Sequence, residues 1–259
     1  MGLSLYSPAR GDRKHRRLRA FLREVDPFAK GDRVPDVPRS NEVLAFDVNE
    51  TLLDLRALDD VFASVFGDAA LRTAWFQQML QLAFVGGLTG EYVDFTTAQH
   101  KALEMLAART GTTLSGEQSE EIVSCMRRLP PHADVREGLS ALREAGFRQV
   151  TLTNSPLDVV RDQLAFAGLS GLFDDVLSAD EVKQLKPGAK PYHHVANRAG
   201  VDVSAVRLVA AHAWDVSGAL AAGAKAAFVA RPGMVLSPVG NQPDIVVDDL
   251  RQLAPLLVG

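Results

Sequence analysis

Asp47 is the residue of this sequence whose type and position most directly suggest chemistry, because it ends the apolar run of residues 43–46. Such a run is typical of a strand buried on both faces, and open α/β sheets bind ligands outside the carboxyl ends of these strands. A carboxylate is ionised at neutral pH and can form a covalent ester without a base to activate it. Asp47 could equally cap the helix that follows, and residue type and spacing alone leave both interpretations open.

Polar residues follow three later apolar runs and could act together with Asp47. Thr153 and Asn154 can donate hydrogen bonds to an anion or a leaving group, although they also suit a turn. Lys186 could keep a neighbouring carboxylate ionised or hold a substrate carboxylate or phosphate. Asp215 could orient this lysine or a hydrolytic water, or it could cap a helix. These residues would all lie at the edge of the sheet that carries Asp47, and together they are stronger evidence for a functional site than any one of them alone.

Strands and helices that alternate along the chain must position these residues. The further strands are expected at residues 148–153, 176–178, 206–211, 226–230 and 245–247. The helices are expected at residues 135–146, 157–167, 192–200, 216–223 and 250–257. Repeated βα units of this kind predict an α/β fold with a doubly wound parallel sheet, in which all strands end at one edge.

Residues 55–131 contain no convincing strand and are predicted to form an all-helical insertion after the first strand. Aromatic and aliphatic residues recur there at the spacing of buried helix faces. Gly86, Gly87 and Gly111 are expected to separate the individual helices.

Length and composition predict an ordinary soluble protein with a sizeable core, since the chain has 259 residues, 47% hydrophobic content and a net charge of −4. No apolar run reaches the length of a membrane helix, and the N-terminus lacks the apolar stretch of a secretory signal. A membrane protein is therefore not expected, and the cytoplasm is the predicted location. The single cysteine, Cys125, has no partner motif and is interpreted as structural or incidental.

Residues 1–40 differ in charge from the rest of the chain. They hold ten Lys/Arg and five Asp/Glu, whereas the other residues hold 18 basic and 27 acidic side chains. The stretch is interpreted as a basic, flexible arm with one short helix near residues 18–25. Nucleic acid is not favoured as a partner, because no aromatic interleaving or binding motif accompanies the charge.

Taken in order, the strand ends resemble the four motifs of the haloacid dehalogenase (HAD) superfamily, and specifically those of the type II 2-haloacid dehalogenases. The matching residues are Asp47 and Thr51 in the first motif, Thr153 and Asn154 in the second, Lys186 and Tyr192 in the lysine motif, and Trp214 and Asp215 in the last. The resemblance implies a HAD-like, Rossmann-like core domain of residues 41–54 and 132–259 with a helical cap domain of residues 55–131. A homodimer is implied by the resemblance alone.

The resemblance also implies a mechanism, in which Asp47 attacks the halogen-bearing carbon of a short 2-haloacid and Thr51 is its hydroxyl partner. Halide leaves, an aspartyl ester forms, and water activated near Lys186 and Asp215 cleaves the ester. The residues implied to bind the substrate carboxylate or halide, or to line the pocket, are Asn49, Phe76, Thr153, Asn154, Lys186, Tyr192, His212 and Trp214. The cap would exclude competing water.

Asn49 restricts the type of reaction that the site is expected to catalyse. Phosphatases of this superfamily carry a second acid at that position and hold Mg²⁺ with an acidic pair near the last motif. Asn49 cannot donate or take a proton, and Ala211 stands where a further acid is expected. A dehalogenase without metal ligands or any cofactor is therefore predicted, since a halide leaves without protonation. Two alternatives stay open: a phosphatase in which Glu50 replaces the missing acid, and a catalytically degenerate HAD domain that binds a small molecule or a partner.

Two positions depart from the pattern of the type II dehalogenases. Phe76 stands where the family has a cap arginine that helps to receive the halide, and His212 stands where an asparagine is usual. An aromatic ring favours an apolar substituent but cannot supply a charge-assisted hydrogen bond. If the alignment through the cap is shifted by a few residues, Arg72 or Lys101 could supply the missing charge.

Overall fold

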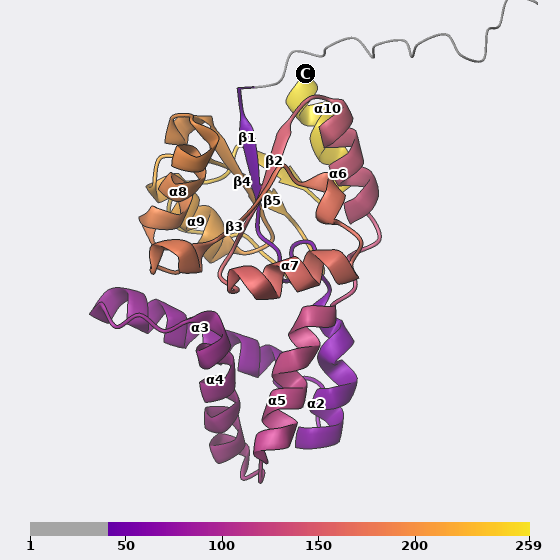
Figure 1. Cartoon of the computed structure of the whole chain (residues 1–259), viewed down its shortest axis with the longest axis vertical. Coiled ribbons are helices and arrows are strands. Elements are labelled where there is room, and N and C mark those ends of the chain that lie inside the picture. Colours follow the sequence, from indigo (N-terminus) through magenta and orange to yellow (C-terminus); the bar gives the residue numbers. More distant parts are fainter. Residues whose placement is uncertain (1–40) are drawn as a thin grey trace, which may run out of the picture. The chain divides into compact units, whose positions relative to one another are not determined.

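The computed structural model describes residues 41–259 and contains a six-stranded sheet (Figure 1). The strands are β1 Val43–Phe46, β2 Arg148–Thr153, β3 Asp175–Ser178, β4 Val206–Ala210, β5 Lys225–Val229 and β6 Ile245–Val247, in the spatial order β3-β2-β1-β4-β5-β6. Every neighbouring pair is parallel, which confirms the predicted doubly wound α/β fold. The predicted basic arm of residues 1–40, with its short helix, lies outside the described residues.

Helices cover both faces of the sheet (Figure 1). They are α6 Val135–Glu144, α7 Leu157–Phe166, α8 Ala189–Ala199, α9 Ala213–Ala221 and α10 Leu253–Val258. Successive residues of a strand point to opposite faces. Leu44 and Phe46 accordingly join the apolar cluster that includes α6, α7 and α10, whereas Val43 and Ala45 join the cluster that includes α8 and α9. The run of residues 43–46 is thus buried on both faces, as its composition predicts.

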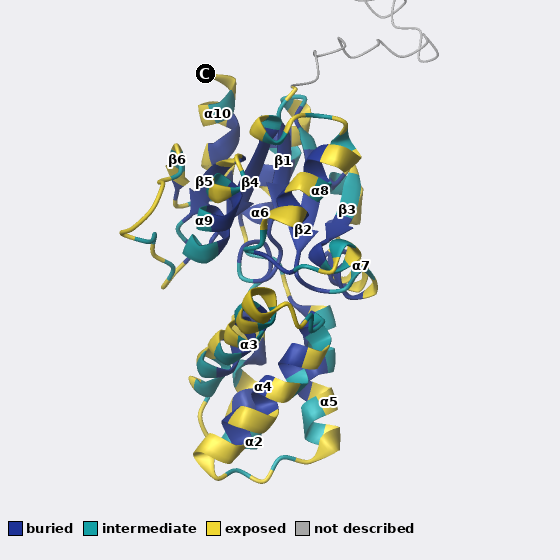
Figure 2. Ribbon diagram, turned by 90° about the vertical axis from the view of Figure 1, so that its left-hand side faces the viewer, coloured by how far each residue is buried: buried dark blue, intermediate teal, exposed yellow. Residues whose placement is uncertain are grey.

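Four helices lie between β1 and α6 in the sequence: α2 Asp59–Phe66, α3 Leu71–Thr89, α4 Phe95–Thr110 and α5 Gly116–Cys125. They lie beyond the edge of the sheet at which β1 ends (Figures 1 and 2). The two ends of this helical insertion, residues 55–131, meet where the Asp54 N–H donates to the Pro130 carbonyl at 2.8 Å. The insertion therefore leaves and rejoins the sheet layer close to Asp47, and its division from the rest as a separate cap domain stays a prediction.

Apolar side chains of the insertion continue the core of the sheet. Phe62 and Trp75 belong to the same buried cluster as Leu44 and Phe46. Cys125, at the end of α5, is half-buried and forms no disulfide. No helix among residues 41–259 is both long enough and apolar enough to cross a membrane.

The prediction that Gly86 and Gly87 separate two helices is wrong, because α3 continues through both and ends at Gly90 with φ of 78°. Gly86 serves close packing instead. A Cβ atom at this position would lie 2.5 Å from the carbonyl oxygen of Glu91, so only glycine lets the following loop approach the helix. The predicted break at Gly111 is confirmed, since this residue ends α4 with φ of 70°.

Gly86→Ala is expected to lower the free energy of unfolding by about 1–3 kcal/mol, the usual cost of a steric overlap that the backbone must relieve. Gly87→Ala is the matched control, because no atom lies within 4 Å of the place that an added Cβ would take. It should raise the free energy of unfolding by up to about 1 kcal/mol, since alanine favours a helix over glycine. Urea denaturation of both variants measures the difference, and equal effects of the two would contradict this account of α3.

Candidate active site

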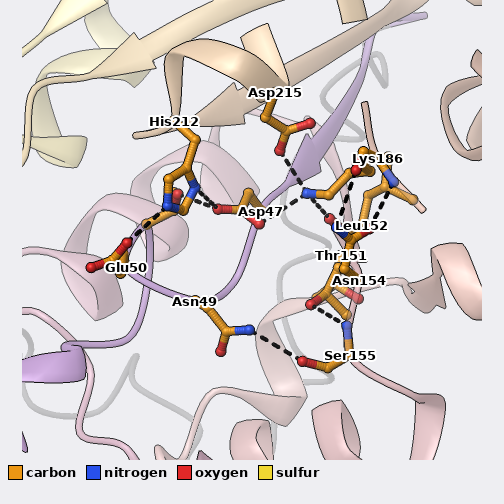
Figure 3. Close-up of polar contacts among 12 residues, drawn as sticks. Asp47, Asn49, Glu50, Thr151, Leu152, Asn154, Ser155, Lys186, His212 and Asp215 are labelled. Carbon is orange, nitrogen blue, oxygen red and sulfur yellow. Dashed lines mark hydrogen bonds and ion pairs between the residues drawn. The ribbon is translucent and has the colours of Figure 1, made fainter. Parts of the chain in front are cut away.

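Asp47 follows β1 directly, at the carboxyl edge of the sheet and between the ends of β2 and β4 (Figure 3). Its backbone N–H donates to the Val209 carbonyl at 3.1 Å, and the residue is 4% exposed. The chain then turns, because the N–H groups of Leu52 and Leu53 both donate to the Val48 carbonyl. This turn brings Thr51 back to the carboxylate, where its hydroxyl donates to Asp47 Oδ2 at 2.6 Å.

Lys186 joins Asp47 to Asp215 (Figure 3). Its ammonium donates to Asp47 Oδ1 at 2.9 Å, to Asp215 Oδ2 at 2.6 Å and to the Leu152 carbonyl at 2.7 Å. The other oxygen of Asp215 accepts from the Tyr192 hydroxyl at 2.6 Å. An ammonium has three donors, so all donors of Lys186 are used inside the protein. Binding of a substrate carboxylate by Lys186 would require one of these bonds to break.

Burial and mutual contact set the protonation of these groups. Burial alone would raise the pKa of Asp47, but the Lys186 ammonium and His212 hold that pKa well below its usual value. Burial alone would lower the pKa of Lys186, but the carboxylates of Asp215 and Asp47 raise it. Burial and the charge of Asp47 raise the pKa of Asp215, against the effect of Lys186. Asp47 is therefore an ionised carboxylate at neutral pH, which is the form that can act as a nucleophile.

His212, two residues after the end of β4, lies between two carboxylates (Figure 3). Its Nδ1 is 2.9 Å from Asp47 Oδ2, and its Nε2 is 3.0 Å from Glu50 Oε2. Burial lowers the pKa of His212, but hydrogen bonds to the two carboxylates raise it to about 9. The side chain is thus an imidazolium at neutral pH and donates from both nitrogens. The rings of Phe76 and Trp214 stack against it, with centroid distances of 6.0 and 5.1 Å.

Glu50 lies in the site, but not in the role that the sequence suggested for it. Its spacing from Asp47 suggested only a substitute for the missing acid of a phosphatase. The residue has φ of 61°, in the left-handed region that few non-glycine residues adopt. Its carbonyl oxygen is 3.1 Å from His132 Nε2, and its carboxylate points to His212 rather than to Asp47. Arg72 of α3 lies 3.8 Å from the other carboxylate oxygen. The only sequence signal for this role is an acid inside the loop that follows β1.

The polar residues after β2 hold the loop that carries Lys186. Asn154 Oδ1 accepts from the Lys186 N–H at 2.8 Å, and Asn154 Nδ2 donates to the Lys186 carbonyl at 3.3 Å. Thr153 Oγ1 accepts from the Ser155 N–H at 3.1 Å. These contacts place the ammonium of Lys186 in front of Asp47.

Asn49 is fixed as a neutral amide near the nucleophile. Its Nδ2 donates to Ser155 Oγ at 3.1 Å, and its Oδ1 accepts from Gln163 Nε2 at 3.0 Å. Both ends of the amide are engaged, and neither can serve as an acid. Two residues after Asp47, the site therefore holds an amide that cannot transfer a proton.

Two neighbouring cavities open at the carboxyl edge of the sheet. The inner one, of about 10 Å³, is lined by Asp47, Asn49, Phe76, Leu80, Phe95, Thr153, Asn154, Lys186, His212 and Trp214. The outer one, of about 420 Å³, shares Phe76, Leu80, His212 and Trp214 with it and reaches Glu50, Arg72, His132 and Arg231. Most of the residues predicted for the site therefore meet at one place, and two helices of the insertion contribute Phe76, Leu80 and Phe95 to its wall.

Some predicted residues lie behind the cavity rather than in its wall. Tyr192 is fully buried, does not line either cavity and donates to Asp215, so its position does not support the predicted contact with substrate. Arg72 pairs with Asp59 at 2.6 Å and lines only the outer cavity. Lys101 is exposed, pairs with a glutamate on its own helix and lines neither cavity, which removes it as a source of charge.

The carboxylates of the site do not fit a Mg²⁺ ion. Magnesium needs several oxygen ligands in a near-octahedral arrangement. Here the Lys186 ammonium lies between Asp47 and Asp215 and is hydrogen-bonded to both. Within the described part of the chain, no three His, Cys, Asp or Glu side chains are grouped so as to hold a metal. Lys186 supplies the positive charge between these two carboxylates.

The sequence that forms most of this sheet and its aspartate–lysine site matches a family model. The model for haloacid dehalogenase-like hydrolases covers residues 42–223. The chain therefore belongs to this family, and the resemblance inferred from the four motifs is confirmed.

Among its relatives, the (S)-2-haloacid dehalogenase of Pseudomonas sp. (strain YL) is 29% identical over 217 residues, which cover 82% of this chain and 93% of that protein. The (S)-2-haloacid dehalogenase of Xanthobacter autotrophicus is 30% identical and is covered over 75% of its length by 73% of this chain. A solved structure of L-2-haloacid dehalogenase from Xanthobacter autotrophicus with chloropropionic acid covalently bound is similar, with a TM-score of 0.79 and 26% identity. The similarity covers 84% of this chain and 98% of that structure.

Proposed function

We propose that this chain is a hydrolytic dehalogenase of short 2-haloacids, the activity after which its relatives are named. The proposal is carried by the ionised Asp47 carboxylate, which lines the inner cavity together with Asn49. An alkoxide leaving group needs a proton from a nearby acid, whereas a halide does not. The amide of Asn49 is hydrogen-bonded at both ends and supplies no proton, so the site suits a halide as the leaving group.

In the first step of the proposed reaction, Asp47 attacks the halogen-bearing carbon, and the electron pair of the carbon–halogen bond leaves with the halide. Oδ1 is the better attacking atom, because it accepts one hydrogen bond whereas Oδ2 accepts two. Water then adds to Cγ of the ester and releases a 2-hydroxyacid. One water proton ends on the product hydroxyl, and the other is released as the carboxylate forms again.

The inner cavity is too small for a haloacid as it stands. Its volume of about 10 Å³ is about the least that admits one water molecule, so a substrate must displace side chains to reach Asp47. Phe76 and Leu80 of α3 line both cavities and are the side chains of the insertion that would move. The helical insertion would thus act as a cap that closes over the substrate and excludes competing water.

Trp214 offers a donor for the leaving halide, which Phe76 cannot provide. Its indole Nε1–H is buried and has no hydrogen-bond partner among residues 41–259. A buried donor without a partner is costly, and a halide in the adjoining cavity would relieve that cost. The location in the cytoplasm and a homodimer remain predictions from the sequence.

Halide release from L-2-chloropropionate in the presence of EDTA tests the proposed function. We expect release to continue undiminished, because the residues present supply positive charge without a metal. A panel of phosphate esters with Mg²⁺ is the parallel assay and should yield no phosphate. Magnesium-dependent phosphate release without any halide release from chloro- or bromo-substituted 2-haloacids would contradict the proposal.

A further inference from the structure

The two oxygens of Asp47 have different surroundings. Thr51 Oγ1 donates to Oδ2 at 2.6 Å and His212 Nδ1 at 2.9 Å, whereas Oδ1 accepts only from Lys186. The Thr51 proton must point to Asp47, because the hydroxyl oxygen itself accepts from the Ala211 N–H at 2.9 Å. Oδ2 therefore lies in a pre-formed pair of donors.

His212 is held in its donating form by the groups around it. Glu50 accepts from Nε2 at 3.0 Å, which leaves Nδ1–H directed at the nucleophile. Phe76 from the helical insertion and Trp214 stack on the imidazole ring, and the residue is only 5% exposed. Arg72 Nη1 lies 3.8 Å from the other carboxylate oxygen of Glu50. The geometry thus resembles a positioned donor rather than a solvated histidine.

We propose that Thr51 and His212 form an oxyanion site at Oδ2 of Asp47, and that Glu50 maintains His212 as its charged donor. This inference rests on the proposed function, because it concerns the step in which water cleaves the Asp47 ester. When the ester forms through Oδ1, Oδ2 becomes its carbonyl oxygen and receives negative charge as water adds to Cγ. Donors at about 2.7–3.1 Å from such an oxygen, in a closed site, stabilise the charge strongly.

The ester of Asp47 is cleaved in two steps. The water oxygen bonds to Cγ while the carbonyl electron pair moves onto Oδ2. That pair then re-forms the bond between Cγ and Oδ2 as the bond between Cγ and Oδ1 breaks. The electron pair of that bond leaves with the product oxygen, which takes one proton of the water. The second water proton is released, and His212 keeps its own proton throughout, unlike a general base.

The charge on His212 depends on the charged and titratable groups that surround it. These are Asp47 and Glu50 in direct contact, Arg72 and Lys186 behind those carboxylates, and His132 at the Glu50 carbonyl. In the free protein they raise the pKa of His212 to about 9. The ester removes the negative charge of Asp47, so the pKa of His212 must be lower at that stage, although Glu50 still raises it. Ester hydrolysis should therefore slow as the pH rises through a value below about 9.

Quenched-flow mass spectrometry with L-2-chloropropionate separates formation of the ester from its decay. In His212→Gln we expect a first equivalent of halide at nearly the wild-type rate, followed by ester decay that is about 10²–10³-fold slower. In Glu50→Gln we expect the falling limb of ester decay to move to lower pH, because His212 loses the carboxylate that holds its proton. His100→Gln is the control and should match the wild type, since the polar contacts of this ring within residues 41–259 are with Ser119 and Glu120 of the insertion.

Several outcomes would overturn the inference. One is ester decay at the wild-type rate in His212→Gln, and another is a decay rate that increases with pH, which would make His212 a base. Loss of the first halide equivalent in His212→Gln would place the residue in the first step instead. If that variant does not fold, an unchanged falling limb in Glu50→Gln decides against the proposal. A wild-type protein that forms no ester and releases no halide contradicts the proposed function itself, which distinguishes the two failures.

Discussion

Asp47→Ala should abolish halide release, with a loss of about 10⁴-fold or more in kcat, as is usual when a nucleophile is removed. Of the two carboxylates bonded to Lys186, only that of Asp47 lines the inner cavity. Asp215 lies behind Lys186, and both of its oxygens accept hydrogen bonds. No neighbour can therefore replace Asp47. Halide release and the mass of the intact protein after incubation with substrate measure the effect, and no covalent adduct should form in the variant.

The matched control for this substitution is Asp162→Ala. Asp162 is an exposed carboxylate on α7 that pairs with Arg127 and lines neither cavity. Its removal should leave kcat unchanged and alter the free energy of unfolding by less than about 0.5 kcal/mol. Retained turnover in Asp47→Ala would contradict covalent catalysis, even if the control behaves as expected.

The sheet could be predicted from the sequence because its strands are buried on both faces. Such strands appear as short continuous apolar runs, and the run at residues 148–153 coincides with β2 Arg148–Thr153. Helix boundaries were harder to predict from the sequence. Helix α8 begins at Ala189, although Pro191 suggests a later start at residue 192. Proline is tolerated in the first turn of a helix, where its missing N–H has no intrahelical partner to lose.

Contacts between distant segments could not be predicted from local patterns. Gly86 and Gly87 look alike in the sequence, yet only Gly86 faces the returning backbone at Glu91. The same limit applies to the site. Glu50 and His212 are 162 residues apart, and their contact depends on the left-handed backbone of Glu50. Neither property has a signature in the residues nearby.

The strand-end rule placed the other site residues more successfully. Asp47 follows β1, Lys186 lies beyond β3, and Asp215 lies in the first turn of the helix after β4. Parallel strands must end at one edge of the sheet, so the meeting of these residues was predictable. The rule could not predict which side-chain atoms remain available to bind a substrate. The three donors of Lys186 are all used within the protein, and Tyr192 contacts Asp215 rather than the cavity. Such roles depend on side-chain directions that only packing determines.

Lys186→Met is expected to abolish turnover and to lower the free energy of unfolding at pH 8 by about 3–5 kcal/mol, the usual cost of removing one partner from a buried ion pair. Methionine fills a similar volume but leaves the carboxylates of Asp47 and Asp215 buried without the cation between them. The Leu152 carbonyl loses its donor as well. Urea denaturation measures the loss of stability, and halide release measures the loss of turnover.

The destabilisation by Lys186→Met should be smaller at pH 5 than at pH 8. In the wild type the pKa of Asp47 is lowered, so the pair stabilises the fold above the unfolded pKa and loses this effect only at strongly acidic pH. In the variant, burial and mutual repulsion remain while the cation is gone, so the pKa values of Asp47 and Asp215 both rise relative to the wild type, although His212 and Thr51 still lower that of Asp47. The folded variant therefore binds more protons than the folded wild type and gains stability relative to it as the pH falls. Lys183→Met removes an exposed lysine that pairs with Asp180 and should shift stability by less than about 0.5 kcal/mol at either pH. Equal destabilisation by Lys186→Met at both pH values would show that lost packing, rather than unpaired charge, is the cause.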